Sequence, residues 1–185
     1  MESRNSPGEI YIAGITYDSL VDGEGVRVSI FVSGCSRHCK GCFNKRAWNY
    51  LYGRRLDEDL MQTILSAVER PYISGITIVG GEPMEHENVL GVLYIIDRIK
   101  SHCAYMDIRR SVWVYTGFKF EELLHDRDTL NILMHTDVLV DGQYDETLRD
   151  VTLPFRGSSN QRIIDVKKSI AQDKVVLWTP QGEKA

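Results

Sequence analysis

Short runs of β-branched and aromatic residues recur along this chain, and stretches with helical spacing separate them. Such runs predict strands, and apolar side chains that recur at the helical period predict helices. The strand-like runs are Val26–Val32, Gly75–Val79, Ser111–Tyr115 and Thr136–Val140. The helix-like stretches are Leu56–Glu69, Glu87–His102 and one that begins at Phe120–His125. Strands that alternate with helices favour βαβ units and a mostly parallel sheet.

The length of the chain limits how far such units can extend. The 185 residues hold about four or five βα units, which is too few for a closed eightfold barrel. We therefore expect an α/β fold built as a partial, open βα barrel with a mostly parallel sheet. One domain should cover residues 1–164, and a polar, charged tail of unknown role should cover residues 165–185. Within that tail, Val175–Trp178 could add a short strand.

Composition narrows the class of partner. The formal net charge is −4, so the basic patch of a nucleic-acid-binding surface is not expected. A hydrophobic content of 43% can support one core. No run approaches the roughly 18 apolar residues of a membrane span, and Met1–Glu9 lacks the apolar core of a secretion signal. We expect a cytoplasmic protein that has neither a membrane nor a nucleic acid as its partner.

Three of the four cysteines, Cys35, Cys39 and Cys42, follow directly after the first strand-like run, and Cys103 lies far from them. Clustered thiols in a chain without a secretion signal favour metal ligation over a disulfide scaffold. Zinc is one alternative, but it normally takes four ligands, and His38 next to Cys39 would strain a tetrahedral site. A [4Fe–4S] cluster on three thiolates would leave one iron open for chemistry. We expect that cluster, and a structural role for Cys103.

A second motif follows the second strand-like run and reads Gly80-Gly81-Glu82-Pro83. Glycine allows the backbone to approach a ligand closely, so Gly80, Gly81 and Glu82 are candidate ligand-binding residues. Thr116 and Asp141 stand at the ends of the next two strand-like runs. Because the carboxyl ends of parallel strands meet at one edge, both should face the same mouth. Asp-Gly is also a common turn sequence, which is the alternative role for Asp141.

The spacing of the cysteines resembles that of the radical S-adenosylmethionine (SAM) superfamily. The resemblance implies that the open iron binds SAM, which is cleaved to methionine and a 5′-deoxyadenosyl radical. Gly80–Pro83 resembles the GGEP motif, whose backbone receives the SAM ammonium group in that superfamily. Members often carry an aromatic residue just before the third cysteine, whereas this chain has Gly41 there and Phe43 just after Cys42. Gly41, Cys42 and Phe43 are therefore candidates for the adenine contact, with core packing as the alternative for Phe43.

Longer segments look like one family, the anaerobic ribonucleoside-triphosphate reductase activating proteins. The segments are Asp22–Cys35, Gly41–Trp48, Trp113–Gly117, Val138–Gly142 and Arg156–Gln161, in order within about Tyr11–Ile164. The family often has Asp where this chain has Glu82. The resemblance implies abstraction of a hydrogen atom from a glycine Cα of the large reductase. It also implies an electron donor such as flavodoxin or ferredoxin.

Other functions stay open at this point. An activase for another glycyl radical enzyme, such as pyruvate formate-lyase, would use the same chemistry. Small-molecule enzymes such as carboxydeazaguanine synthases also carry Gly-Glu-Gly before their cysteines. An iron–sulfur electron carrier or a zinc module would need no SAM. No acid–base pair stands out, and we expect His38 and His86 to be solvated loop residues. The polar stretch Arg156–Gln161 could contact SAM or a partner, or simply form a loop.

Overall fold

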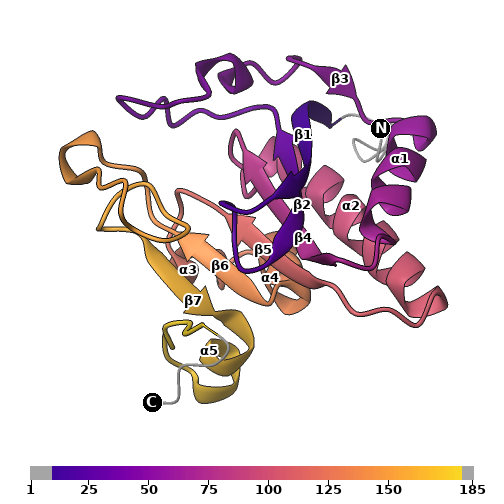
Figure 1. Ribbon diagram of the computed structural model, residues 1–185. Helices are drawn as coiled ribbons and strands as arrows, with labels where there is room; N and C mark the ends of the chain where they lie inside the picture. The colour runs from indigo at the N-terminus through magenta and orange to yellow at the C-terminus, as the bar shows by residue number, and fades with distance from the viewer. Residues whose placement is uncertain (1–9, 181–185) are drawn as a thin grey trace.

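The computed structural model describes residues 10–180, which form one seven-stranded sheet with the order β3-β1-β2-β4-β5-β6-β7 (Figure 1). The four central strands run parallel, and β1, β3 and β7 pair antiparallel at the two edges. Over these residues the sheet is open, because β3 and β7 end the order without pairing with each other. The strands are β1 (Tyr11–Ser19), β2 (Val26–Val32), β3 (Arg54–Arg55), β4 (Ile73–Gly80), β5 (Ser111–Tyr115), β6 (Val138–Asp141) and β7 (Arg162–Asp165).

The central strands confirm the prediction of a largely parallel α/β sheet. All four runs of β-branched residues became β2, β4, β5 and β6, although β6 begins two residues later than the run Thr136–Val140. Strands buried on both faces read as nearly continuous apolar runs, which explains why the pattern found them. The mixed edges are a correction, because the sequence analysis identified no strand over β1, β3 or β7.

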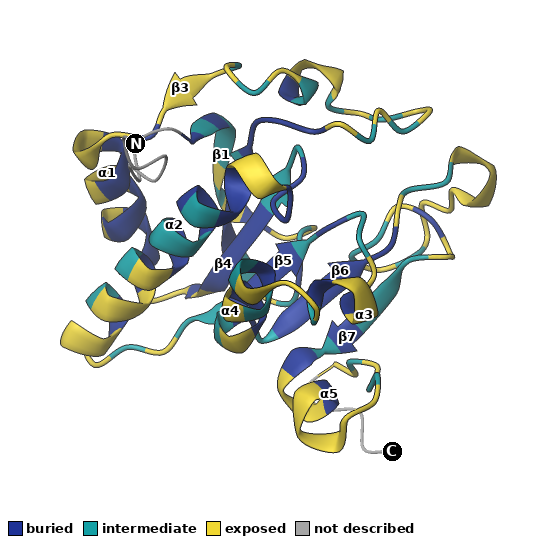
Figure 2. Cartoon of the chain, turned by 180° about the vertical axis from the view of Figure 1, so that it is seen from behind, coloured by how far each residue is buried: buried dark blue, intermediate teal, exposed yellow. Residues whose placement is uncertain are grey.

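Within the described residues, five α-helices connect or follow the strands: α1 (Glu58–Val68), α2 (His86–Tyr105), α3 (Phe120–Leu123), α4 (Arg127–His135) and α5 (Val166–Gln172). Two single turns of 3-10 helix also occur, η1 (Lys45–Trp48) and η2 (Glu146–Leu148). Helices α1, α2 and α4 cover the face of the sheet that Figure 2 turns toward the viewer. None of the helices within residues 10–180 has the length and apolar character needed to span a bilayer.

The caps of the helices explain where they begin. Asp57 caps α1 by accepting a hydrogen bond from the backbone N–H of Leu60 at 2.7 Å. The helix expected from Phe120 divides into α3 and α4, because Asp126 accepts from the backbone N–H groups of Asp128 and Thr129 and starts a new helix. Helix α4 was therefore missed by the sequence analysis.

The core lies between the sheet and these helices. Ile76 and Ile78 of β4 are fully buried, as are Ile95 and Ile96 of α2. Each such side chain contributes about 1.5–3 kcal/mol relative to remaining in water. Cys103 belongs to this core and is 6% exposed, as its expected structural role requires.

The C-terminal part of the described chain returns to the sheet. After β7 and α5, the backbone N–H of Trp178 donates to the carbonyl oxygen of Ile163 at 2.9 Å. The short strand considered for Val175–Trp178 is present only as a bridge between Leu177 and Ile164. The polar start of the chain, Met1–Glu9, lies outside the described residues.

Candidate cluster and cofactor site

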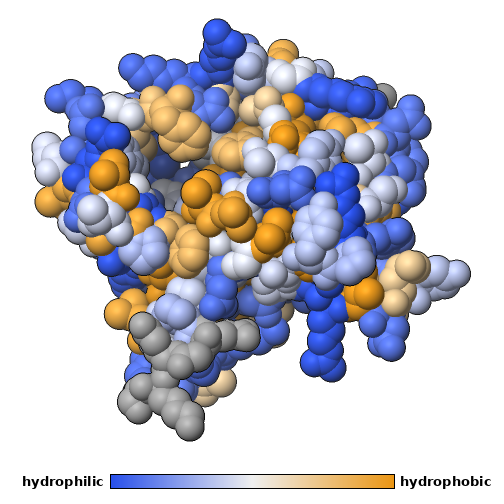
Figure 3. All heavy atoms as spheres, viewed as in Figure 1, coloured by the Kyte–Doolittle hydropathy of each residue, from blue (hydrophilic) through white to orange (hydrophobic). Residues whose placement is uncertain are grey.

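An open cavity of about 810 Å³ lies at the carboxyl edge of the parallel strands. Most of its wall comes from the cysteine loop after β2 (residues 33–44), the turn after β4 (residues 81–85) and the β6–β7 loop (residues 142–161). Residues 20–22 of the β1–β2 loop and residues 115–117 at the end of β5 also line it. Figure 3 shows the hollow between the cysteine loop and the β6–β7 loop. The predicted site residues that line it are Cys35, Cys39, Gly41, Cys42, Phe43, Gly80, Gly81, Glu82 and Thr116.

The three clustered cysteines are free thiols on this cavity wall. Cys35 is 8% exposed, and burial raises the pKa of its thiol, although the backbone N–H groups of Arg37 and His38 act against the rise. Between residues 10 and 180, no three His, Cys, Asp or Glu side chains converge on one metal ion. Thiols spaced around a shared cavity suit a four-iron cluster, in which each thiolate binds a different iron. Three cysteine thiolates are a donor set that fits a [4Fe–4S] cluster.

The turn after β4 packs directly under the cysteine loop. The backbone N–H of Gly81 donates to the carbonyl oxygen of Val32, and that of Glu82 donates to the carbonyl oxygen of Gly34, both at 2.7 Å. A Cβ added to Gly81 would lie 2.3 Å from the Gly34 oxygen. Gly81 is thus required for close packing against the cysteine loop, whereas the sequence pattern had suggested close approach to a ligand.

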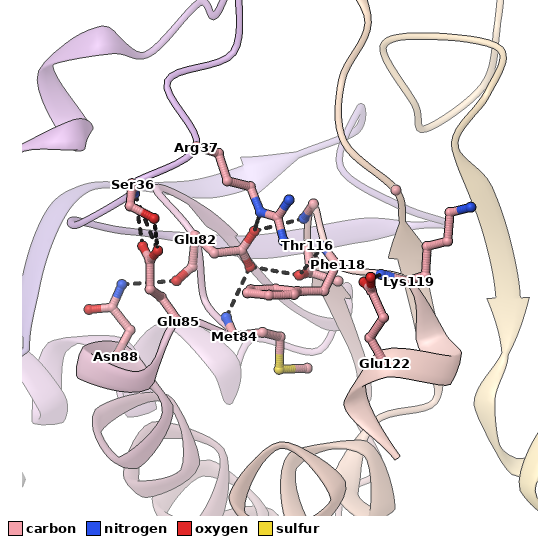
Figure 4. A network of polar contacts seen from close by, with 12 residues as sticks. Ser36, Arg37, Glu82, Met84, Glu85, Asn88, Thr116, Phe118, Lys119 and Glu122 are labelled. Atoms are coloured by element: carbon pink, nitrogen blue, oxygen red, sulfur yellow. Dashed lines mark hydrogen bonds and ion pairs between the residues drawn. The ribbon is translucent and has the colours of Figure 1, made fainter. Parts of the chain in front are cut away.

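Glu82 ties three loops together through its carboxylate (Figure 4). Its Oε1 accepts from the backbone N–H of Met84 at 3.0 Å and from the hydroxyl of Thr116 at 2.6 Å. Its Oε2 accepts from the backbone N–H of Gly117 at 2.7 Å and from Nε of Arg37 at 3.0 Å. The side chain is 2% exposed. Burial raises the pKa of Glu82, and these four donors act against the rise.

Arg37 joins this network from between the first two cysteines. Its guanidinium carbon lies 3.9 Å from the centre of the Phe118 ring, while its Nε bonds to Glu82. A cation held over an aromatic face and paired with a buried carboxylate is well fixed. The next residue, His38, is exposed and stacks on Trp48 with ring centres 4.4 Å apart. Exposure at His38 confirms the expectation of a solvated loop residue.

A second carboxylate holds the cysteine loop from below. Glu85 accepts hydrogen bonds from the backbone N–H of Ser36 at 3.0 Å and from the Ser36 hydroxyl. In the first turn of α2, Nδ2 of Asn88 donates to the carbonyl oxygens of Gly34 at 3.1 Å and Glu82 at 2.9 Å. Arg37, Glu85 and Asn88 are site residues that no motif in the sequence predicted. The only local signal for the last two was a run of polar residues where an apolar helix begins.

Known proteins resemble the chain over most of its length. A family model for a 4Fe–4S single cluster domain matches residues 21–164. The anaerobic ribonucleoside-triphosphate reductase-activating protein of Pasteurella multocida is 38% identical over 146 residues, 78% of this chain and 90% of that protein. The protein of the same name from Escherichia coli K12 is 36% identical over 144 residues, 77% of this chain and 90% of that protein. Its namesake from Enterobacteria phage T4 is 34% identical over 144 residues, 78% of this chain and 86% of that protein.

This chain belongs to the family of anaerobic ribonucleoside-triphosphate reductase-activating proteins. The resemblance drawn from the cysteine spacing is therefore confirmed, because this family is part of the radical SAM superfamily. The family model ends at Ile164, so residues 165–180, which form α5 and the bridge to β7, lie outside the matched segment.

The chain lacks the aromatic residue that the superfamily often carries just before the third cysteine, because Gly41 stands there and Phe43 follows Cys42. Gly41 has a positive φ of 75°, and a Cβ there would lie 2.6 Å from Oε1 of Glu146 in the β6–β7 loop. A side chain at this position would be strained by the positive φ, and the flexible side chain of Glu146 would have to move aside. Phe43 is 83% exposed, so the core-packing alternative for its ring is wrong.

Asp141 lies behind the cavity wall, at the end of β6. Its buried carboxylate accepts from the backbone N–H of Phe120 at 2.8 Å and from Nε of Arg162 at 2.9 Å. Among the described residues, the cavity lining includes its neighbour Gly142 rather than Asp141. Three residues of the stretch considered for a SAM or partner contact do line the cavity, namely Arg156, Gly157 and Gln161.

Proposed function

We propose that the chain activates an anaerobic ribonucleoside-triphosphate reductase by forming a glycyl radical on it. Cys35, Cys39 and Cys42 would hold one [4Fe–4S] cluster, and SAM would bind in the adjoining cavity. One observation carries the proposal: three free cysteines and the turn at Gly80–Glu82 line the same open cavity. The names of the relatives, which are activating proteins for this reductase, support the choice of partner.

Held by Cys35, Cys39 and Cys42, the cluster would supply the electron for reductive cleavage of SAM, and this radical chemistry would remove a hydrogen atom from a glycine Cα of the reductase. The chain itself needs to bind, orient and shield these groups. Transfer of a hydrogen atom needs no acid or base, so the proposal assigns no residue to that role. The open sheet would serve as the partial barrel, and its mouth would admit a loop of the partner.

We assign the cofactor contacts by what each residue presents to the cavity. Gly80 and Gly81 would offer backbone groups to the ammonium group of SAM, as the motif implies. Gly41 and Cys42 would present backbone polar groups to the adenine of SAM, and the exposed ring of Phe43 would cover the adenine.

The remaining predicted residues would act mainly by support. Glu82 and Thr116 bond to each other at 2.6 Å and would hold the floor of the SAM site in place. The carboxylate of Asp141 is already bonded to Arg162 and to the backbone of Phe120. It would therefore serve the site by fixing Gly142 on the wall rather than by touching SAM.

The partners follow from the same proposal. The electron donor would be a flavodoxin or a ferredoxin, and the enzyme would act in the cytoplasm. An acidic chain with a formal net charge of −4 suits a protein partner better than a nucleic acid. The domain over residues 1–164 would carry all of the radical SAM chemistry.

The proposal is tested by mixing anaerobically reconstituted, reduced protein with SAM and an anaerobic ribonucleoside-triphosphate reductase. We expect the electron paramagnetic resonance signal of a glycyl radical together with 5′-deoxyadenosine. Parallel samples contain pyruvate formate-lyase or a carboxydeazaguanine synthase substrate in place of the reductase. A radical only on pyruvate formate-lyase, or a modified small molecule without any glycyl radical, would move the assignment to those alternatives.

A further inference from the structure

Three aromatic side chains from distant parts of the sequence meet beside the cavity. Trp113 of β5 packs against Phe155 of the β6–β7 loop with ring centres 5.4 Å apart, and against Trp178 with ring centres 5.0 Å apart. The centres of Phe155 and Trp178 are 6.1 Å apart. All three pairs are edge-to-face, with interplanar angles of 78°, 73° and 71°. Such pairs are favourable because the positive edge of one ring meets the negative face of another.

The backbone fixes the position of Trp178 in this cluster. The N–H of Trp178 donates to the carbonyl oxygen of Ile163, and the N–H of Asp165 donates to that of Val176, both at 2.9 Å. The hydroxyl of Ser169 in α5 accepts from the N–H of Val176, also at 2.9 Å. The segment after α5 (residues 173–180, the C-terminal segment below) is therefore held along β7, and it delivers the indole to the cavity side of the sheet.

Phe155 is in a conformation that needs such support. Its φ is +55°, in the left-handed region that residues with a side chain rarely adopt. Strain of this kind persists only where the surroundings determine the conformation. Here the carbonyl oxygen of Phe155 accepts from the hydroxyl of Tyr115 at 2.7 Å, and its ring contacts both Trp113 and Trp178. Phe155 and Tyr115 both line the cavity.

We propose that the C-terminal segment braces the cavity wall, and that Trp178 is a positioning residue for SAM. It acts through Phe155, whose strained backbone shapes the part of the β6–β7 loop that lines the cavity. The identity of the ligand rests on the proposed function, whereas the brace itself rests on the packing alone. Trp178 lies beyond residues 21–164, the segment that the family model matches, whereas its partners Trp113 and Phe155 lie within it.

Three variants separate the brace from a general effect of the C-terminal segment. Trp178→Ala removes both ring contacts, and Trp178→Phe keeps an aromatic ring at the same position. Leu177→Ala changes the neighbouring residue, whose side chain is 61% exposed, and is the matched control. Equal iron content in all three variants shows that each retains the cluster site.

The first measurement is hydrogen exchange of residues 150–161 without SAM, and the second is the SAM dissociation constant from a titration of the cluster's paramagnetic signal. For Trp178→Ala we expect faster exchange and a dissociation constant about tenfold higher, which corresponds to about 1.4 kcal/mol. The rate at saturating SAM should stay near that of the unchanged protein. In Trp178→Phe, both the exchange rates and the SAM dissociation constant should return most of the way to those of the unchanged protein. Leu177→Ala should match the unchanged protein in both measurements.

Unchanged exchange and unchanged SAM affinity in Trp178→Ala would overturn the proposal. Equal losses in Leu177→Ala would also overturn it, because the effect would then belong to the segment as a whole. Failure of the unchanged protein to bind SAM would contradict the proposed function instead. In that case the exchange measurement still decides whether Trp178 braces the loop.

Discussion

At the scale of single residues, the site depends on buried polar side chains that bond across loops. Glu82 is the clearest case, since each of its two carboxylate oxygens accepts two hydrogen bonds. The motif predicted Glu82 as a site residue because it is local in sequence. Its partner Arg37 lies 45 positions away and Thr116 lies 34 away, so no local pattern could pair them.

Replacing Glu82 with glutamine should destabilise the fold. The amide nitrogen would face donors, either the pair from Met84 and Thr116 or the pair from Gly117 and Arg37. A lost charge-assisted bond and an opposed donor should lower the free energy of unfolding by about 2 kcal/mol, measured by urea denaturation without oxygen. Glu87→Gln, at an exposed position of α2, is the control. Equal changes in the two variants would contradict the role given to the Glu82 network.

The cysteines make a second test at this scale. Reconstituted protein should hold about four irons and four sulfides per chain. Alanine at Cys35, Cys39 or Cys42 should abolish the cluster. Cys103 is a residue of α2 that is buried in the hydrophobic core, and alanine there should leave the iron content unchanged. Iron analysis of the four variants gives the answer, and loss of iron in Cys103→Ala would refute the three-thiolate site.

At the scale of elements, continuous apolar runs predicted the central strands, whereas the short strands and the strand of mixed polarity were not predicted. The central strands were found because their apolar runs are unbroken. In contrast, β1 mixes Gly14, Tyr17 and Asp18 with apolar residues and changes register along its pairing with β2. Strand β3 has only two residues, and β7 (Arg162–Asp165) has just two apolar residues between charged ends, so neither shows an apolar run. These edge strands depend on antiparallel pairing with other strands, β1 with β2, β3 with β1 and β7 with β6.

The close packing of the turn after β4 against the cysteine loop gives a prediction for Gly81→Ala. The new Cβ would lie 2.3 Å from the carbonyl oxygen of Gly34, so one of the two loops must move. We expect lower iron content and a loss of about 1–3 kcal/mol in the free energy of unfolding. Gly14→Ala is a matched control, because a Cβ at Gly14 meets nothing within 4 Å. Unchanged iron content in Gly81→Ala would show that the loops do not depend on this contact.

At the scale of the whole molecule, the parallel strands bring the cysteine loop, the turn after β4, the residues after β5 and the β6–β7 loop to one edge of the sheet. The cysteine loop and the Gly80–Glu82 turn could be placed there from sequence, because strand ends in a parallel sheet share an edge. The β6–β7 loop and the C-terminal segment could not be placed, since their positions depend on aromatic contacts between Trp113, Phe155 and Trp178. The resulting cavity is open, as a site for a loop of another protein requires.

The central claim is that this open cavity serves transfer of a hydrogen atom from a glycine of a reductase. The most direct measurement uses an anaerobic ribonucleoside-triphosphate reductase that carries deuterium only at its glycine α-carbons. Reduced protein and unlabelled SAM are added, and 5′-deoxyadenosine is analysed by mass spectrometry. We predict one deuterium in the 5′-deoxyadenosine, and no such product from Cys39→Ala. Deoxyadenosine that forms with the reductase present but contains no deuterium would contradict the claim.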